Sequence, residues 1–363
     1  MRLVKDPAHS GPGGWPRLLA DMGGTHARFA WRAGPGQSLE CVLVLPCADF
    51  PGPAQAIREY LARNRLPLPA SAALAVAVPV VADQVQMTNL SWRFSIEALR
   101  AELGLQSLLL LNDFSALALA IPTLKSGQLH RLGPALEARP GPVALLGAGT
   151  GLGVSGLLPD PNGSGQWVPI MGEGGHVTLA AIDDLEFEAI RGLQRQYGHV
   201  SAERVLSGSG LVDLHRVLTK IQGGTEAEKW SAAEIVAQGM QATSGPARQT
   251  LNMFCAWLGS VAGDLALTLG AVGGVYIGGG IAPRLRAFLM ASSFRQRFVA
   301  KGRYQTYLEA IPTWLIESEV SPALEGADQA MTAYGHGGGT KLAGRVTGHT
   351  EGSVIGPEQS PLS

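Results

Sequence analysis

Charged side chains are scarce in this sequence: Asp, Glu, Lys and Arg make up 16% of its 363 residues, and the formal net charge is −1. The sequence contains no run of Lys or Arg, whereas proteins that bind nucleic acid or anionic membranes concentrate positive charge. We therefore expect neither nucleic acid nor a membrane as a partner. Hydrophobic residues reach 46%, which is enough for large cores and excludes global disorder.

Cysteine is rarer still, with only three residues. Cys41, Cys47 and Cys255 form neither a CxxC pair nor a Cys/His spacing typical of a zinc site, so a disulfide framework and a structural zinc site are excluded. The first 16 residues lack the apolar core of a secretory signal. These absences favour a reducing compartment, and we expect the protein to be cytoplasmic.

One long apolar stretch, residues 254–282, carries a single charge, Asp264. Its length allows a membrane span, but the central Asp would be costly in lipid and GGVYIGGG interrupts the stretch. We interpret it as a buried helix followed by a buried strand.

The sequence also lacks a Walker A motif, GxxxxGK[ST]. Three other Gly-rich turns each follow a predicted strand: residues 21–25 (DMGGT), 147–153 (GAGTGLG) and 278–280 (GGG). Such turns can present backbone N–H groups to phosphate oxygens, although ordinary hairpin turns favour Gly too. Because all three stand at strand ends, the pattern favours a phosphate-binding protein.

Asn112 and Asp113 stand between a predicted buried strand (residues 108–111) and a predicted helix (residues 116–120). Ligands of α/β proteins bind at the carboxyl ends of strands, where a carboxylate can take a proton from a substrate hydroxyl. Asn and Asp are also favoured helix N-caps, so a purely structural role is the alternative.

Glu173, His176 and Glu203 fall in predicted loops. If they converge, they can hydrogen-bond several hydroxyl groups at once, as a sugar requires. The alternatives are solvated loop charges or a metal site, but no HExxH or paired-His spacing supports a metal site. Asp21 beside the first turn could hold Mg²⁺, directly or through water, or could serve only as a turn residue.

Two strand-turn-strand units, beginning near residues 17 and 143, predict a duplicated α/β domain with a cleft between the copies. We expect a flexible extension at 1–16, a small domain at 17–123 plus about 320–343, a large domain at 124–319 and a disordered tail at 344–363. We also expect the crossover between the domains at 131–142 and a turn at 207–210.

Seven motifs, in this order, resemble those of the bacterial glucokinase family. They are residues 21–28 (DMGGTHAR), 87–92 (MTNLSW), 111–114 (LNDF), 147–153 (GAGTGLG), 172–176 (GEGGH), 198–208 (GHVSAERVLSG) and 273–281 (GGVYIGGGI). The resemblance runs from about residue 18 to 334. It implies two duplicated actin-like ATPase (ribonuclease H-like) domains, ATP and Mg²⁺ as cofactors, glucose as substrate and a homodimer.

Carried over by position, Asp113 resembles the catalytic base that accepts the proton of the glucose 6-hydroxyl. The resemblance also assigns a sugar-binding set and an ATP-binding set. The sugar-binding set is Asn112, Asp113, Glu173, His176 and Glu203. The ATP-binding set is Asp21, Met22, Gly23, Gly24, Thr25, Gly149, Thr150, Gly151, Gly279 and Gly280, with Asp21 also holding Mg²⁺ through water.

Two positions depart from the family pattern: His26 replaces the usual Asn, and Ser209 replaces a common Pro. The CxCGxxGC zinc signature of the other bacterial glucokinase group is absent. A kinase for mannose or fructose, or a non-catalytic sugar-sensing protein, are the alternatives to glucose phosphorylation.

Overall fold

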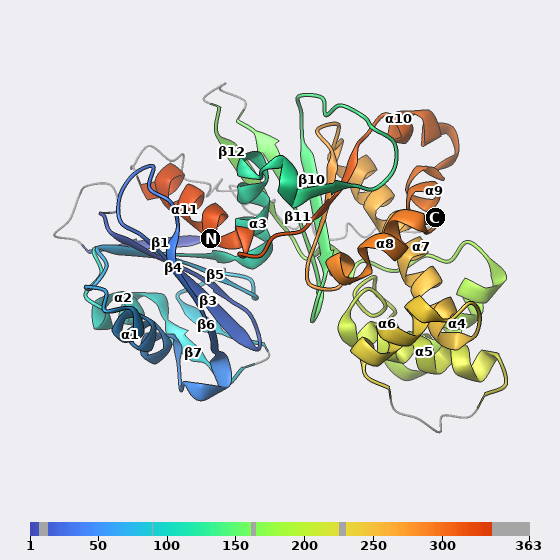
Figure 1. Ribbon diagram of the computed structural model, residues 1–363, viewed down its shortest axis with the longest axis horizontal. Coiled ribbons are helices and arrows are strands. Elements are labelled where there is room, and N and C mark those ends of the chain that lie inside the picture. The colour runs from blue at the N-terminus through green and yellow to red at the C-terminus, as the bar shows by residue number, and fades with distance from the viewer. Residues whose placement is uncertain (7–13, 89, 161–164, 225–229, 336–363) are drawn as a thin grey trace, which may run out of the picture.

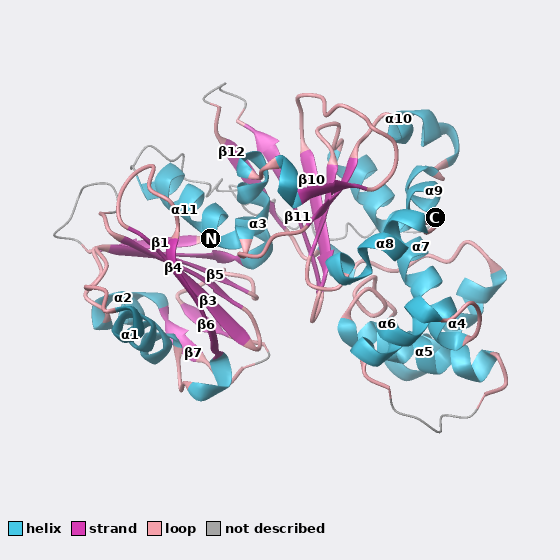
Figure 2. Ribbon diagram, in the orientation of Figure 1, coloured by secondary structure: helices cyan, strands magenta, loops and turns pink. Residues whose placement is uncertain are grey.

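The computed structural model describes residues 1–6, 14–88, 90–160, 165–224 and 230–335, and the predicted tail at 344–363 lies outside them. Two six-stranded sheets and a two-stranded hairpin form the framework (Figure 2). The hairpin pairs β6 (Gln84–Gln86) with β7 (Arg93–Ser95).

The two sheets have the same strand order. The first runs β1 (Arg2–Lys5), β8 (Ser107–Asn112), β5 (Ser71–Val76), β2 (Arg17–Met22), β3 (His26–Arg32) and β4 (Glu40–Pro46). From its other edge, the second runs β9 (Leu129–Arg131), β14 (Thr313–Ile316), β13 (Val275–Gly278), β10 (Val143–Ala148), β11 (Leu152–Pro159) and β12 (Trp167–Met171). In the first sheet β8, β5 and β2 are parallel to one another, and β2 is antiparallel to β3. The second sheet repeats this pattern: β14, β13 and β10 are parallel, and β10 is antiparallel to β11.

The prediction of a flexible extension over residues 1–16 is wrong for residues 2–5, which form a strand. Strand β1 pairs antiparallel with β8, with Arg2 opposite Leu110 and Lys5 opposite Ser107. Leu3 and Val4 point to opposite faces of the sheet, and each packs against a different hydrophobic core. This alternation of two apolar side chains is the physical reason for a strand. Residues 7–13 of the extension lie outside the described part of the chain.

Helices α1 (Pro53–Asn64) and α2 (Ile96–Glu102) cover one face of the first sheet, where Ile57 and Leu99 are buried with strand side chains such as Leu74. Figure 1 shows these two helices below the sheet. The Ser95 hydroxyl caps α2 by accepting a hydrogen bond from the N–H of Ala98 at 3.0 Å.

A second group of helices packs around α7 (Pro246–Leu269), which itself lies against β10 of the second sheet (Figure 1). The group also comprises α4 (Asp184–Tyr197), α5 (Gly208–Ile221), α6 (Ala232–Gln241), α8 (Arg286–Ala291), α9 (Phe294–Val299) and α10 (Gln305–Glu309). Helix α7 is long and apolar enough to span a membrane by length and composition. However, 72% of its most apolar window is buried inside the protein, so it is a core helix, as the sequence predicts.

Helices α3 (Asp113–Ala120) and α11 (Pro322–Gly335) pack against each other between the two sheets. Helix α11 lies on β2 and β5 of the first sheet, whereas α3 contacts β11 and β12 of the second (Figure 1). One hydrophobic core, which includes Leu109 of β8, Leu145 of β10 and Met331 of α11, therefore joins both sheets.

Two further expectations are wrong. The chain already enters the second sheet at β9, so the crossover lies before residue 129 rather than at 131–142. The expected turn at 207–210 is the first turn of α5: the Ser207 hydroxyl accepts a hydrogen bond from the N–H of Gly210 at 3.0 Å. Leu211, Leu214 and Leu218 then repeat at helical spacing and are buried.

The contact between α3 and α11 leaves no room for a side chain at Gly326, because a Cβ there would lie 1.7 Å from the carbonyl oxygen of Ala116. We predict that Gly326→Ala lowers the free energy of unfolding by about 2 kcal/mol or more, because two helix backbones must move apart. Helix propensity alone would give the opposite sign. Urea unfolding measures the difference. The control is Gly127→Ala, where a Cβ meets nothing within 4 Å; equal stability of the two variants would contradict the prediction.

Candidate active site

Asn112 and Asp113 occupy the junction of β8 and α3, and the expected helix cap is present. The Asn112 side chain is the N-cap of α3, because its Oδ1 accepts hydrogen bonds from the N–H groups of Phe114 at 3.0 Å and Ser115 at 3.2 Å. Asn112 Nδ2 donates to Asp113 Oδ1 at 3.1 Å, and the Phe114 N–H donates to the same oxygen at 2.9 Å. The cap thus fixes Oδ1 of Asp113, while Oδ2 receives no hydrogen bond from any other described residue.

The pKa of Asp113 is raised from its ordinary value of 3.8 to about 7. Burial is the largest cause, and the negative charges of Asp21 and Glu173 add to it, whereas the hydrogen bond from the Phe114 N–H lowers the pKa. Asp21 of β2 and Glu173 of the loop after β12 are therefore each close enough to Asp113 to affect it. A carboxylate with a pKa near neutrality is suited to proton transfer.

Glu173, His176 and Glu203 are brought together by two loops. The Glu203 N–H donates to the carbonyl of Gly175 at 2.8 Å, and an isolated β-bridge joins Thr178 to Ser201. His176 Nδ1 lies 3.9 Å from Glu203 Oε1. Glu173 and His176 are exposed, so their polar groups are available to a ligand.

Glu203 also contacts the second Gly-rich turn. Its Oε2 accepts a hydrogen bond from the Leu152 N–H at 2.9 Å. A Cβ on Gly151 would lie 2.4 Å from that same oxygen, so the close approach requires glycine. The predicted sugar-binding loop and a predicted phosphate-binding turn are thereby in direct contact.

The second and third Gly-rich turns lie side by side. β10 and β13 are parallel neighbours, and the Ile281 N–H after β13 donates to the Ala148 carbonyl at 3.1 Å. The Gly149 carbonyl accepts a hydrogen bond from the Gly208 N–H at 2.9 Å, which brings the start of α5 to the same place.

Sequence reasoning missed the start of α5, although the Ser207 cap followed by apolar residues at helical spacing could have revealed it. Among the predicted ATP-binding residues of the second and third turns, Thr150 and Gly280 are exposed, and Gly149, Gly151 and Gly279 are partly exposed.

The first Gly-rich turn is the β2–β3 hairpin. The Gly23 N–H donates to the carbonyl of His26 at 3.0 Å, with Gly24 and Thr25 at the tip. Met22 differs from the rest of the predicted ATP-binding set, because its side chain is fully buried in the core, so it can offer only backbone atoms to a ligand. Asp21, one residue earlier, is 9% exposed.

Two partners of Asp21 were not predicted. Its Oδ2 accepts a hydrogen bond from the Ser321 hydroxyl at 2.7 Å and one from Arg28 Nη1 at 3.4 Å. Ser321 is 300 residues away in sequence and carries no motif. Arg28 could have been paired with Asp21 from the hairpin register, in which the two residues are opposite each other.

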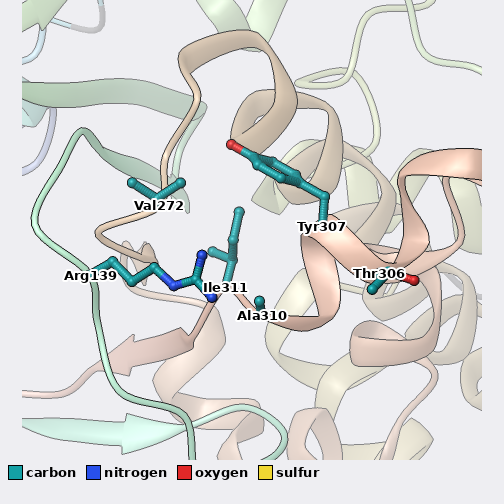
Figure 3. A pocket seen from close by; sticks show the side chains of 6 residues that line it. All are labelled: Arg139, Val272, Thr306, Tyr307, Ala310 and Ile311. Carbon is teal, nitrogen blue, oxygen red and sulfur yellow. The ribbon is translucent and has the colours of Figure 1, made fainter.

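A pocket of about 240 Å³ lies away from these residues (Figure 3). It is lined by Arg139, Val272, Thr306, Tyr307, Ala310 and Ile311. None of these belongs to the predicted site, so the pocket is separate from it.

Known proteins resemble this chain over most of its length. A family model described as Glucokinase matches residues 18–334. The chain belongs to the glucokinase family. A curated glucokinase from Aromatoleum aromaticum is 50% identical over 318 residues, which cover 87% of this chain and 95% of that protein. A curated glucokinase from Chromobacterium violaceum is 49% identical over 315 residues, covering 87% and 89%. The crystal structure of a glucokinase from an Antarctic psychrotroph has a TM-score of 0.77 at 37% identity and covers 88% of this chain and 99% of that one. The predicted family is therefore confirmed.

The raised pKa of Asp113 predicts a pH-dependent cost in stability. Because the folded-state pKa of about 7 is above the ordinary 3.8, the native protein holds a proton that the unfolded chain releases between these values. The wild type should therefore lose stability, relative to Asp113→Asn, as the pH rises from about 4 to about 7, with no further change above. Urea unfolding of both proteins between pH 5 and 8 measures this, and parallel curves would contradict it.

Proposed function

We propose that this protein transfers the γ-phosphoryl group of ATP to the 6-hydroxyl of glucose, giving glucose 6-phosphate and ADP. The observation that carries the proposal is the raised pKa of Asp113, on a side chain fixed by the cap of α3 among two other carboxylates. Membership of the glucokinase family and the curated glucokinases at about half identity support the same activity.

In this proposal Asp113 is the base. Its Oδ1 is held by Asn112 and Phe114, which leaves Oδ2 to accept the proton of the 6-hydroxyl as the oxygen attacks the γ-phosphorus. Phosphoryl transfer needs alignment and charge stabilisation more than covalent chemistry from the protein. A base that is fixed before the substrate arrives supplies part of that alignment.

Glucose would be held by Asn112, Glu173, His176 and Glu203. Asn112 uses its Oδ1 for the helix cap, so its contribution to a sugar hydroxyl is the second N–H of Nδ2. Glu203 already uses Oε2 on the Leu152 N–H, which leaves Oε1, beside His176, for the sugar. Sugar binding would then also stabilise the turn at 149–151.

ATP would lie against the three Gly-rich turns, with backbone N–H groups facing its phosphates. Asp21 fits a magnesium ion held partly through water, because its Oδ1 receives no hydrogen bond from the described residues. Within the described residues no three His, Cys, Asp or Glu side chains converge on one point, which suits an ion that keeps several waters and binds substrate phosphates. Magnesium would offset negative charge on the transferring phosphoryl group.

We infer that the two sheets belong to duplicated actin-like ATPase (ribonuclease H-like) domains that close over a cleft, with the limits expected from the sequence after residue 17. Their common strand order supports the duplication. Closure would exclude water, which otherwise accepts the phosphoryl group. A homodimer remains a prediction.

The substrate is tested by a coupled assay with ATP, Mg²⁺ and either glucose, mannose, fructose or N-acetylglucosamine. We expect kcat/KM to be highest for glucose. A higher value for another sugar would keep the mechanism and change the substrate. Sugar binding by calorimetry without any turnover would instead support the sugar-sensing alternative.

We predict that Asp113→Ala lowers kcat by about 100- to 10,000-fold and changes KM for glucose far less, because the variant loses the base but keeps most sugar contacts. In the wild type, kcat/KM should fall as the pH falls through about 7, because protonated Asp113 cannot accept a proton. Steady-state kinetics from pH 5.5 to 9 test both statements. A normal kcat in the variant would show that Asp113 is not the base.

A further inference from the structure

Asp21 is the one predicted metal-binding side chain, and its two oxygens have different surroundings. Oδ2 accepts the Ser321 hydroxyl at 2.7 Å and Arg28 Nη1 at 3.4 Å. Oδ1 receives no hydrogen bond from the residues that the structure describes. Because the charge of Asp21 raises the pKa of Asp113, the carboxylate lies close enough to act on the base.

Ser321 belongs to the connection between the two sheets. Residues 317–321 lead from the end of β14 to the start of α11. This connection is attached to the other one, at 121–128, because the Glu317 N–H donates to the Gln128 carbonyl at 2.9 Å and Gln128 Nε2 donates to the Ser318 hydroxyl at 2.8 Å. Ser321 is thus supported on its N-terminal side.

On its C-terminal side, α11 is anchored along β2. Asp328 forms buried ion pairs with Arg17 at 2.8 Å and with Arg32 at 2.6 Å. Ser321 and Asp328 are about 10 Å apart along a helix, and their partners Asp21 and Arg17 are about 13 Å apart along a strand. These similar spans let α11 contact both ends of β2, so the position of the Ser321 hydroxyl is well determined.

We propose that Ser321 is a positioning residue for Asp21, and that the orientation of this carboxylate toward magnesium depends on the Ser321 hydroxyl. The inference rests on the proposed function, in which Asp21 holds the ion through water. A carboxylate can rotate about its Cβ–Cγ bond, and a hydrogen bond to Oδ2 fixes that rotation. Without it, Oδ2 keeps only Arg28, whose side chain is 43% exposed and whose contact is long.

The same hydrogen bond joins the metal site to the connection between the sheets. Within the described residues the chain crosses between the two sheets at 121–128 and at 317–321, so a change in their relative position would affect the connection that carries Ser321. Ser321 therefore makes the orientation of Asp21 sensitive to the position of the second sheet.

The test measures binding rather than turnover. Titration calorimetry gives the affinity for ADP with and without Mg²⁺, for the wild type and for Ser321→Ala. We expect the variant to bind MgADP about tenfold more weakly, since a hydrogen bond to a charged group is lost. Its affinity for metal-free ADP should be unchanged. Ser321→Thr, which keeps a hydroxyl, should bind MgADP within about threefold of the wild type.

Ser126→Ala is the matched control, because it removes an exposed hydroxyl from the other connection between the sheets and breaks none of the contacts that support Ser321. It should bind MgADP as the wild type does. If Ser321→Ala does not fold, as judged by its thermal unfolding, the pair Ser321→Thr and Ser321→Val makes the same comparison at nearly constant volume.

Two results would overturn the inference. Unchanged MgADP binding in Ser321→Ala, or an equal loss for ADP and MgADP, would show that Ser321 does not act through the metal site. A wild type that binds ADP equally with and without Mg²⁺ would instead remove the magnesium role of Asp21, and the inference with it. Glucose phosphorylation by the wild type separates that result from a failure of the proposed reaction.

Discussion

The packing of α3 against α11 is the contact on which the rest of the molecule depends. It is the centre of the core that joins both sheets, and it is so close that Gly326 lies against the Ala116 carbonyl. Each of the two helices also begins at the candidate active site. α3 begins at Asp113, and α11 begins after Ser321, which holds Asp21. The proposed base and the proposed metal-binding carboxylate are therefore positioned by the same pair of helices.

The negative charges around Asp113 disfavour its ionised form, and the proposed reaction gives a reason for this arrangement. The negative charges of Asp21 and Glu173 both act on Asp113, and among the described residues the only cation within hydrogen-bond distance of these three carboxylates is Arg28. Repulsion and burial keep a proton on Asp113 at a pH where an ordinary Asp has lost it. In the proposed reaction, the ion and the phosphates would bind into this field, and the sugar hydroxyl would meet a base with a pKa near neutrality.

The sequence was most informative where local chemistry decides the structure. The junction at Asn112 and Asp113 follows from four leucines and a cap residue, and the three Gly-rich turns follow from glycine at strand ends. Ser207 shows the limit of this approach: its turn signal was recognised, but the helix that it caps was not. Contacts between distant segments could not be predicted. Nothing near Ser321 indicates Asp21, and the contact between Glu203 and Leu152 depends on how two loops fold together. The crossover was placed too late because Pro and Gly are frequent at 131–142, whereas β9 is only three residues long.

Strand β1 precedes the region matched by the family model, which begins at residue 18. It nevertheless occupies the place in the first sheet that β9 occupies in the second, antiparallel to the last parallel strand. A shortened chain cut to the family limits would retain every proposed catalytic residue but would leave the outer backbone groups of β8 without a partner strand. Unpaired strand edges recruit other chains. Residues 2–5 thus give the strand that carries Asn112 its outer hydrogen-bonding partner, although they lie outside the region that the family model matches.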